Sequence, residues 1–137
     1  MSASICALLG FTAWTLILVV SVVLYRTGLV FSFKKKANSW GRDEVTNDPA
    51  IIKRLAHAHA NCVENLPVVA AIILVAAVTD QLAVTDGLAC WLLAARVAQS
   101  TVHAIGVSHW LVFIRANFYF IQIGILFWWL IKLTGVA

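Results

Sequence analysis

The stretch RLAHAHANCVENLPVVAAIILVAAV, residues 54–78, joins a polar half and an apolar half in one continuous segment. Residues 54–65 include an arginine, two histidines, two asparagines and a glutamate. Residues 68–78, by contrast, include no charged residue and no amide side chain. The apolar half has the composition of a membrane-spanning helix. Because one charged side chain at a bilayer centre costs about 3 kcal/mol on insertion scales, the polar half needs polar partners.

The whole chain is more apolar than a water-soluble domain. Of its 137 residues, 62% are hydrophobic and 12% are charged, whereas a soluble domain carries about 25% charged residues. A soluble core of this length cannot bury so much apolar surface. The composition therefore predicts a membrane protein.

Four apolar runs are long enough to cross a bilayer, for which a helix needs about 20 residues. They cover about 5–26, 50–79, 87–106 and 110–133, and the polar residues 27–49 connect the first two. The first run lacks early basic residues and ends in Tyr25-Arg26, which indicates a retained span rather than a cleaved signal peptide. The sequence therefore predicts an all-α integral membrane protein, with a single four-helix bundle domain over 1–137.

The charges of the connections predict the orientation. Between Arg26 and Arg54 there are seven basic and three acidic residues, whereas the other predicted loop, DQLAVTD at 80–86, is acidic. Because Lys and Arg favour cytoplasmic loops, we expect the first loop in the cytoplasm and both termini across the membrane. We interpret the lysines at 34–36 as an orientation and lipid-headgroup signal rather than a nucleic-acid patch. The compactness of the chain is consistent with a bacterial inner membrane.

Three of the predicted helices carry polar side chains along one face. The second helix is predicted to start at Asp48-Pro49, with Asp48 as N-cap and Pro49 at its first position. At 100° per residue, His57, Asn61 and Glu64 of the second helix lie within about 60° of one another, and Arg54 lies near the same face one turn earlier. The third helix repeats the pattern at i, i+3, i+4 and i+7. The residues are Arg54, His57, Asn61 and Glu64 on the second helix, Arg96, Gln99, Ser100 and His103 on the third, and Arg115 and Asn117 on the fourth. We expect them to turn inward and meet in the cytoplasmic half of the bilayer.

The predicted pocket holds more cations than anions. Three arginines face a single acid, Glu64, which can neutralise only one of them. The imbalance predicts a site for an anionic ligand, because unpaired cations are poor interhelical contacts. A haem or metal site at His57 and His103 is a weaker alternative, since two histidines lack a supporting ligand set, and we expect no metal.

Other polar or reactive residues have a simpler interpretation. We interpret Asn65, Gln99 and Ser100 as contacts that hold helices together, at about 0.6 kcal/mol per contact, and His59 as a packing or interfacial residue. The three cysteines have no paired spacing, so they are interpreted as packing thiols. A reactive Cys62 beside the polar cluster is the alternative.

The pattern R-x₆-N-x₂-E-x₂-P, after an Asp-Pro helix start, resembles the second helix of the MAPEG family, the membrane-associated proteins in eicosanoid and glutathione metabolism. Its residues are Arg54, Asn61, Glu64 and Pro67. The string NCVEN is similar to the same segment of microsomal glutathione transferases. The stretch RVAQSTVH, residues 96–103, resembles the third helix of the family, and Arg115 falls where the family has an arginine near the start of the fourth. The resemblance covers essentially the whole chain.

This resemblance implies a homotrimer of four-helix subunits that binds glutathione as co-substrate between neighbouring subunits. Asn61 and Glu64 would hold polar groups of the peptide, Glu64 its amino end. Arg54 and Arg96 would meet its carboxylates. Arg115 would stabilise the thiolate, because a nearby cation favours the charged form of a thiol.

Two residues depart from the family pattern. His57 stands where well-studied members carry arginine, and His103 stands where they carry tyrosine. Both belong to the expected glutathione site, with Arg54, Asn61, Glu64 and Arg96, while Arg115 is the expected catalytic residue. The departures bear on glutathione binding and on synthase activity, and they leave the fold assignment intact.

Two functions remain open at this level. The first is a glutathione-dependent transferase or peroxidase that acts on small lipophilic electrophiles arriving from the membrane lipid. The second is a non-catalytic membrane scaffold or lipid-binding protein of the same fold, in which the polar residues only hold the trimer together. Glutathione binding and conjugation of an aryl halide distinguish the two.

Overall fold

The computed structural model of the chain describes residues 1–41 and 47–135. It contains four helices, α1 (Ala3–Phe31), α2 (Ala50–Val78), α3 (Leu82–Ile105) and α4 (His109–Leu133). Each is long and apolar enough to cross a membrane, and the described residues contain no strand. The predicted all-α membrane fold with four spans is confirmed. Arg42, Asp43 and Glu44 of the predicted first loop lie outside the described residues.

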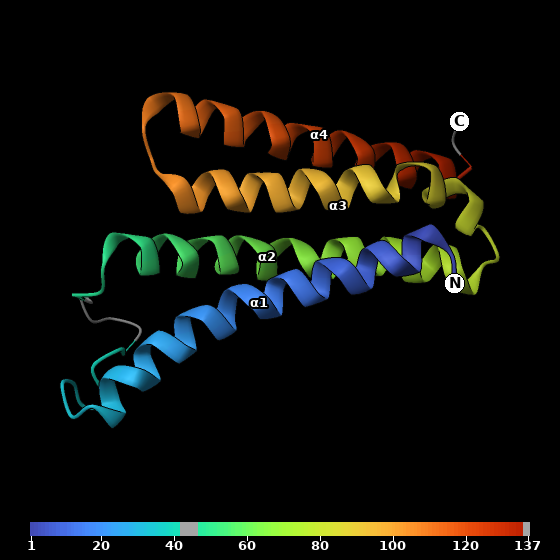
Figure 1. Ribbon diagram of the computed structural model, residues 1–137. Coiled ribbons are helices and arrows are strands. Elements are labelled where there is room, and N and C mark those ends of the chain that lie inside the picture. Colours follow the sequence, from blue (N-terminus) through green and yellow to red (C-terminus); the bar gives the residue numbers. More distant parts are fainter. Residues whose placement is uncertain (42–46, 136–137) are drawn as a thin grey trace.

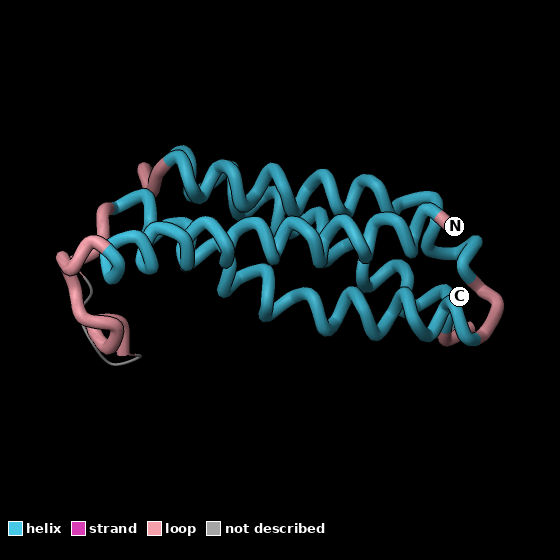
Figure 2. Tube along the Cα trace, turned by 60° about the horizontal axis from the view of Figure 1, so that its bottom comes forward, coloured by secondary structure: helices cyan, strands magenta, loops and turns pink. Residues whose placement is uncertain are grey.

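The helices run up and down and form two ends (Figure 1). One end holds the α1–α2 and α3–α4 connections, and we call it the basic end. The other, the terminal end, holds the α2–α3 connection and both chain termini, which Figure 2 shows from a second direction. The start of α2, the end of α3 and the start of α4 therefore share one end, as the topology predicts.

Helix α3 is the central helix of the bundle. It packs against the other three helices, whereas no Cα atom of α1 lies within 8 Å of a Cα atom of α4. Large apolar side chains from all four helices fill the core between them, among them Phe11, Ile73, Leu92 and Trp129, all at most 1% exposed. Helix α2 contacts α4 only sparsely, so a seam remains between these two helices.

Two helix ends differ from the predicted spans. Helix α1 continues to Phe31, beyond the expected end at residue 26, and α3 begins at Leu82 rather than near residue 87. Most of the predicted acidic loop is therefore helical. The carboxylate of Asp86 accepts hydrogen bonds from the Ser4 backbone N–H at 2.8 Å and from Ser4 Oγ at 2.6 Å. Because α1 satisfies this charge, α3 can start before it.

The prediction that Asp48 caps α2 is wrong. Helix α2 begins at Ala50, and no side-chain hydrogen bond caps its start. Asp48 instead accepts hydrogen bonds from Arg26 Nη2 at 2.9 Å and Trp40 Nε1 at 2.9 Å, and Lys35 Nζ lies 3.7 Å from it. Burial alone would raise the pKa of Asp48, but the hydrogen bonds from Trp40 and Arg26 and the nearby cations hold this pKa below its ordinary value. Three hydrogen bonds, two from Arg26 and one from Trp40, and two nearby cations outweigh a single cap bond.

Candidate functional site

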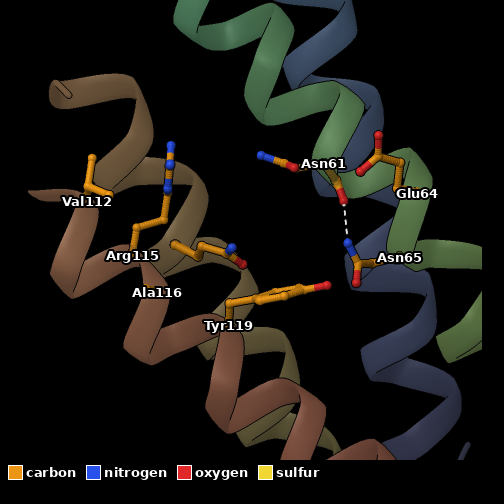
Figure 3. Close-up of a pocket in the computed structure, with 8 residues that line it drawn as sticks. Asn61, Glu64, Asn65, Val112, Arg115, Ala116 and Tyr119 are labelled. Atoms are coloured by element: carbon orange, nitrogen blue, oxygen red, sulfur yellow. Dashed lines mark hydrogen bonds between the residues drawn. The ribbon is translucent and has the colours of Figure 1, made fainter.

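A pocket of about 310 Å³ lies in the seam between α2 and α4 (Figure 3). Helix α3 closes it from behind. Most of its lining side chains are polar or charged. They are Asn61, Glu64 and Asn65 of α2, Gln99 of α3, and Val112, Arg115, Ala116 and Tyr119 of α4. The pocket thus forms where the predicted polar faces of the three helices meet.

Arg115 is the cation that faces the pocket from α4. Its side chain is half-buried, and its Nη1 lies 2.7 Å from Nδ1 of the buried His103 on α3. Since a guanidinium can only donate, His103 Nδ1 accepts, and the imidazole is neutral with its proton on Nε2. Figure 3 shows Asn61 reaching from α2 toward Arg115. The contact with His103 therefore orients a cation toward the pocket without neutralising it.

Arg96 on α3 is a buried cation without a counter-charge among the described residues. Its side chain is 1% exposed, and its Nε has no hydrogen-bond partner. The guanidinium carbon lies 5.2 Å from the ring centroid of Phe11, and no described acid lies within 4.0 Å. A buried charge is costly unless it is paired. Arg96 does not line the pocket, and its buried charge favours an anionic partner.

Arg54 and His57 lie beside the pocket rather than in its lining. Arg54 Nε donates to the carbonyl oxygen of Ala104 at 2.8 Å, in the last turn of α3, where helix carbonyls lack partners within the helix. The exposed His57 ring lies 6.1 Å from the His103 ring, centroid to centroid. Arg54 thus ties α2 to α3, and its Nη groups remain for other partners.

Glu64 lines the pocket but does not neutralise an arginine within the described part of the chain. Its side chain is exposed, and none of the described arginines lies within 4.0 Å. The expectation that Glu64 pairs with one of them is wrong for these residues. Because α2 presents Glu64 on the side opposite Arg115, as Figure 3 shows, the two charges stay apart. The pocket lining therefore holds one cation and one acid that do not pair, whereas the sequence predicted three arginines against one acid.

Sequence reasoning missed Tyr119 and Gln122 on α4. The Tyr119 ring lines the pocket, and its hydroxyl points toward Asn65 (Figure 3). The buried Gln122 donates through Nε2 to Gln99 Oε1 at 3.0 Å and to the Phe118 carbonyl at 2.9 Å. Arg115, Tyr119 and Gln122 follow i, i+4 and i+7, so the periodicity of α4 carried the signal. Asn117, which was expected at the site, is exposed and donates to the Phe113 carbonyl of its own helix.

Among the residues with simpler interpretations, His59, Gln99 and Ser100 lie in helix contacts. Asn65 instead lines the pocket and donates to the Asn61 carbonyl of its own helix at 2.8 Å. Cys6 and Cys90 are exposed, so the interpretation as a packing thiol fits only Cys62. His59 Nδ1 lies 3.2 Å from the Thr15 carbonyl oxygen on α1, which makes His59 a packing residue. Cys62 is fully buried and its Sγ lies 3.5 Å from Ser100 Oγ. No group of three His, Cys, Asp or Glu side chains that could hold a metal gathers in the described ranges.

Four membrane-crossing helices around a polar pocket define a multi-pass integral membrane protein with a polar site in its bundle. The family follows from the sequence as a whole. The chain belongs to the MAPEG family, whose model matches residues 4–135, and the resemblance seen in the helix motifs is thereby confirmed. This membership relates the protein to glutathione and eicosanoid metabolism in membranes. No curated protein and no solved structure matches the chain.

Proposed function

We propose that the protein is a glutathione-dependent transferase or peroxidase that acts on lipophilic electrophiles. The observation that carries the proposal is the charge balance of the pocket region. Arg115 lines the cavity and Arg96 is buried outside its lining, and neither has a described acid within 4.0 Å. The amide side chains of Asn61, Asn65 and Gln99 line the same cavity. Glutathione carries two carboxylates, an ammonium, two peptide groups and a thiol, which is the complementary set of charges and hydrogen-bonding groups.

The residues fit such a ligand in number and kind. Arg96, buried and without a hydrogen bond at Nε, would meet one carboxylate, and the Nη groups of Arg54 would meet the other. The unpaired Glu64 would hold the amino end, and Asn61 the peptide groups. The cavity of about 310 Å³ is within the usual range for small-ligand sites, about 300–1,000 Å³. His103, which stands where well-studied members carry tyrosine, accepts a hydrogen bond from Arg115 and would hold this arginine in place.

Arg115 is the proposed catalytic residue. Bound glutathione supplies the thiol that reacts, and a cation beside a thiol lowers its pKa by favouring the thiolate. His103 holds the guanidinium through the 2.7 Å hydrogen bond from Nη1. Val112 and Ala116, small and apolar, line the α4 side of the same cavity and leave room for a lipophilic partner.

We propose that His103 is a positioning residue for Arg115. His103→Leu removes the acceptor, whereas His103→Asn places an amide oxygen close to the position of Nδ1. Turnover with glutathione should fall about tenfold in His103→Leu, for one hydrogen bond to a charged group. It should recover in His103→Asn, and KM for glutathione should change little in either variant. Equal turnover in both variants would show that the contact does not position Arg115.

We also propose that the protein forms a homotrimer with the site at its subunit interfaces. Several pocket-lining residues, among them Glu64, Val112 and Tyr119, are exposed in the single chain. A neighbouring subunit would cover them and enclose the ligand. Native mass spectrometry in mild detergent should give the trimer mass, and a monomer alone would contradict the proposal.

Glutathione binding to the purified protein in detergent is the decisive test. We expect saturable binding by calorimetry and conjugation of a generic aryl halide. Glutathione carrying methyl esters on both carboxylates should bind more weakly, because it offers the arginines no charge. If neither ligand binds, the transferase proposal is wrong.

A second candidate, a non-catalytic scaffold, has support from a different observation. The Arg54–Ala104, Gln122–Gln99 and Arg115–His103 contacts each join two helices. Polar contacts of this kind hold membrane helices together. A protein that is trimeric but binds no glutathione would fit this function.

A further inference from the structure

The end of α1 and the segment after it, residues 31–41, form a surface that the proposed function does not use. We call it the cap segment. It lies at the basic end, where α1 diverges from the bundle (Figure 1). Its side chains combine two kinds that do not ordinarily face water together. The rings of Phe31 and Phe33 are 79% and 97% exposed, and three consecutive lysines follow at positions 34–36.

Some of the charges in and beside the cap segment are paired within the chain. Asp48 binds Arg26 at 2.9 Å and lies 3.7 Å from Lys35 Nζ. Both cations also lie over the Trp40 ring, at 5.5 and 5.4 Å from its centroid. These contacts anchor the segment to the start of α2 and use one of the three lysines. Lys34 and Lys36 project from the anchored segment and are exposed.

The charge of this region stays positive after every internal pairing. Between Arg26 and Lys53, which leaves out Arg54 of the proposed site, the chain has six basic and three acidic residues, an excess of three cations. Even if each acid neutralises one cation, three positive charges remain. The surface is therefore complementary to an anion.

Phe33 shows that the partner is also apolar. Its φ is +53°, and the bonds Phe33 N–H to Val30 carbonyl at 2.9 Å and Lys34 N–H to Leu29 carbonyl at 3.0 Å close the helix end. Glycine usually takes this left-handed position, because a side chain there is strained. A phenylalanine that is 97% exposed gains almost no packing within the chain in return. Its ring needs a partner outside the chain.

The length of α1 brings these rings to the level of the lipid headgroups. Helix α1 has 29 residues, which at 1.5 Å per residue span about 44 Å. This length matches a bilayer with its headgroup regions, about 40–45 Å. Aromatic side chains favour this level, and lysines there attract anionic lipids. A partner that is anionic on its surface and apolar beneath it is a lipid bilayer.

We propose that the cap segment is a binding surface for anionic phospholipid headgroups. Lys34 and Lys36 contact the headgroup phosphates, and Phe31 and Phe33 enter the boundary between headgroups and hydrocarbon. The bound lipid belongs to the bilayer in which the protein sits, because a soluble anion offers nothing to the two rings.

The first test measures lipid selectivity in nanodiscs of phosphatidylcholine that contain spin-labelled phosphatidylglycerol or spin-labelled phosphatidylcholine. The wild type should prefer phosphatidylglycerol. The double variant Lys34→Gln, Lys36→Gln should lose roughly fivefold of this preference per lysine at low salt, and 1 M salt should weaken the wild-type preference as well.

Lys132→Gln is the matched control, because Lys132 lies at the terminal end, 4.9 Å from the Trp128 ring. It should leave the contribution of the basic end intact. A double variant that selects phosphatidylglycerol as strongly as the wild type would overturn the proposal. Tighter binding of a short oligonucleotide than of phosphatidylglycerol would identify nucleic acid as the partner and overturn it too.

Phe33→Gly separates a lipid role from a role within the chain. Glycine adopts a φ of +53° without strain, so the unfolding temperature in detergent should stay level or rise. In phosphatidylglycerol nanodiscs the same variant should unfold at a lower temperature than the wild type, because the ring no longer enters the lipid. A decrease in both media would assign the ring a role inside the protein, and an equal gain in both would show that it has no lipid contact; either result contradicts the proposal.

Discussion

Two polar clusters lie toward opposite ends of the bundle and differ in whether the chain satisfies them. At the terminal end, Ser4 donates to Asp86 from its backbone N–H and its hydroxyl, and Thr85 Oγ1 lies 2.6 Å from Ser4 Oγ. In the pocket between α2 and α4, Arg115 and Glu64 have no opposite charge among the described residues within 4.0 Å. The first cluster is closed and structural. The second has charges that a ligand can satisfy.

The seam between α2 and α4 shows that a gap alone does not make a polar site. Farther along, toward the terminal end, it holds a second cavity of about 210 Å³. That cavity is lined almost entirely by aliphatic side chains, namely Ala71, Ile72, Val75, Leu130 and Leu133 with Thr134. Two cavities thus lie between the same two helices. Only the first space receives the charges that recognise a polar ligand.

Arg115→Leu should have the largest effect, on the chemistry of the open cluster. Turnover with glutathione should fall about tenfold to a hundredfold, because a charge-assisted contact is worth about 1.5–3 kcal/mol. Affinity for glutathione should change less. A pH titration of the thiolate absorbance of bound glutathione measures the effect, which should be a raised thiol pKa. Asn117→Leu, on the exposed side of α4, is the control, and identical titrations in Arg115→Leu and wild type would rule out Arg115 as the thiolate partner.

Asp86→Ala should act on the closed cluster and lower stability without changing function. It leaves the buried hydroxyl and the N–H of Ser4 without their acceptor, at a cost of about 1–3 kcal/mol in the free energy of unfolding. Denaturant unfolding in detergent gives this value. Glutathione affinity of the remaining folded protein should match the wild type. Weaker glutathione binding would show that the Ser4–Asp86 cluster and the pocket are energetically coupled, which contradicts this prediction.

Arg96→Met should weaken glutathione binding without lowering stability. It replaces a buried cation that lacks a described counter-charge with an apolar chain of similar length, so the free energy of unfolding should stay level or rise by about 1 kcal/mol. Glutathione affinity should fall about tenfold by calorimetry, since a carboxylate loses its partner. If the variant is destabilised and binds normally, Arg96 belongs to the structure rather than to the site.

Asp48 forms a second closed cluster, and its effect should be the smallest. Its folded-state pKa lies below its ordinary value, so the carboxylate contributes stability that is present above the unfolded pKa, about 3.9. This contribution is lost as the pH falls through the folded-state pKa. The unfolding temperature in detergent should therefore drop below about pH 4 in wild type. Asp48→Asn should be less stable near neutral pH and show less of this drop.

The helix motifs predicted the family and the polar faces that meet at the pocket, but not the contacts within it. The spacing of Arg96, Gln99, Ser100 and His103 correctly predicted one buried face of α3. The pairing of Glu64 with an arginine was wrong for the described residues, because a spacing gives the face of a helix and not the distance to a side chain on another helix. The i, i+4, i+7 spacing of Arg115, Tyr119 and Gln122 places all three on one face of α4, so the sequence contained the signal for Tyr119 and Gln122.

By itself, the sequence determined the class of the protein. Apolar runs of about 20 residues and a low charge content require helices that cross a bilayer, and the motif around Arg54, Asn61 and Glu64 marks the family. Only the tertiary structure decided which polar groups are satisfied. Asp48 accepts hydrogen bonds from Arg26 and Trp40 instead of capping α2. Asp86 accepts a hydrogen bond from Ser4 and lies within α3. Hydrogen bonds and ion pairs act over about 3–4 Å, so their outcome depends on how four helices pack and not on the order of residues within any one of them.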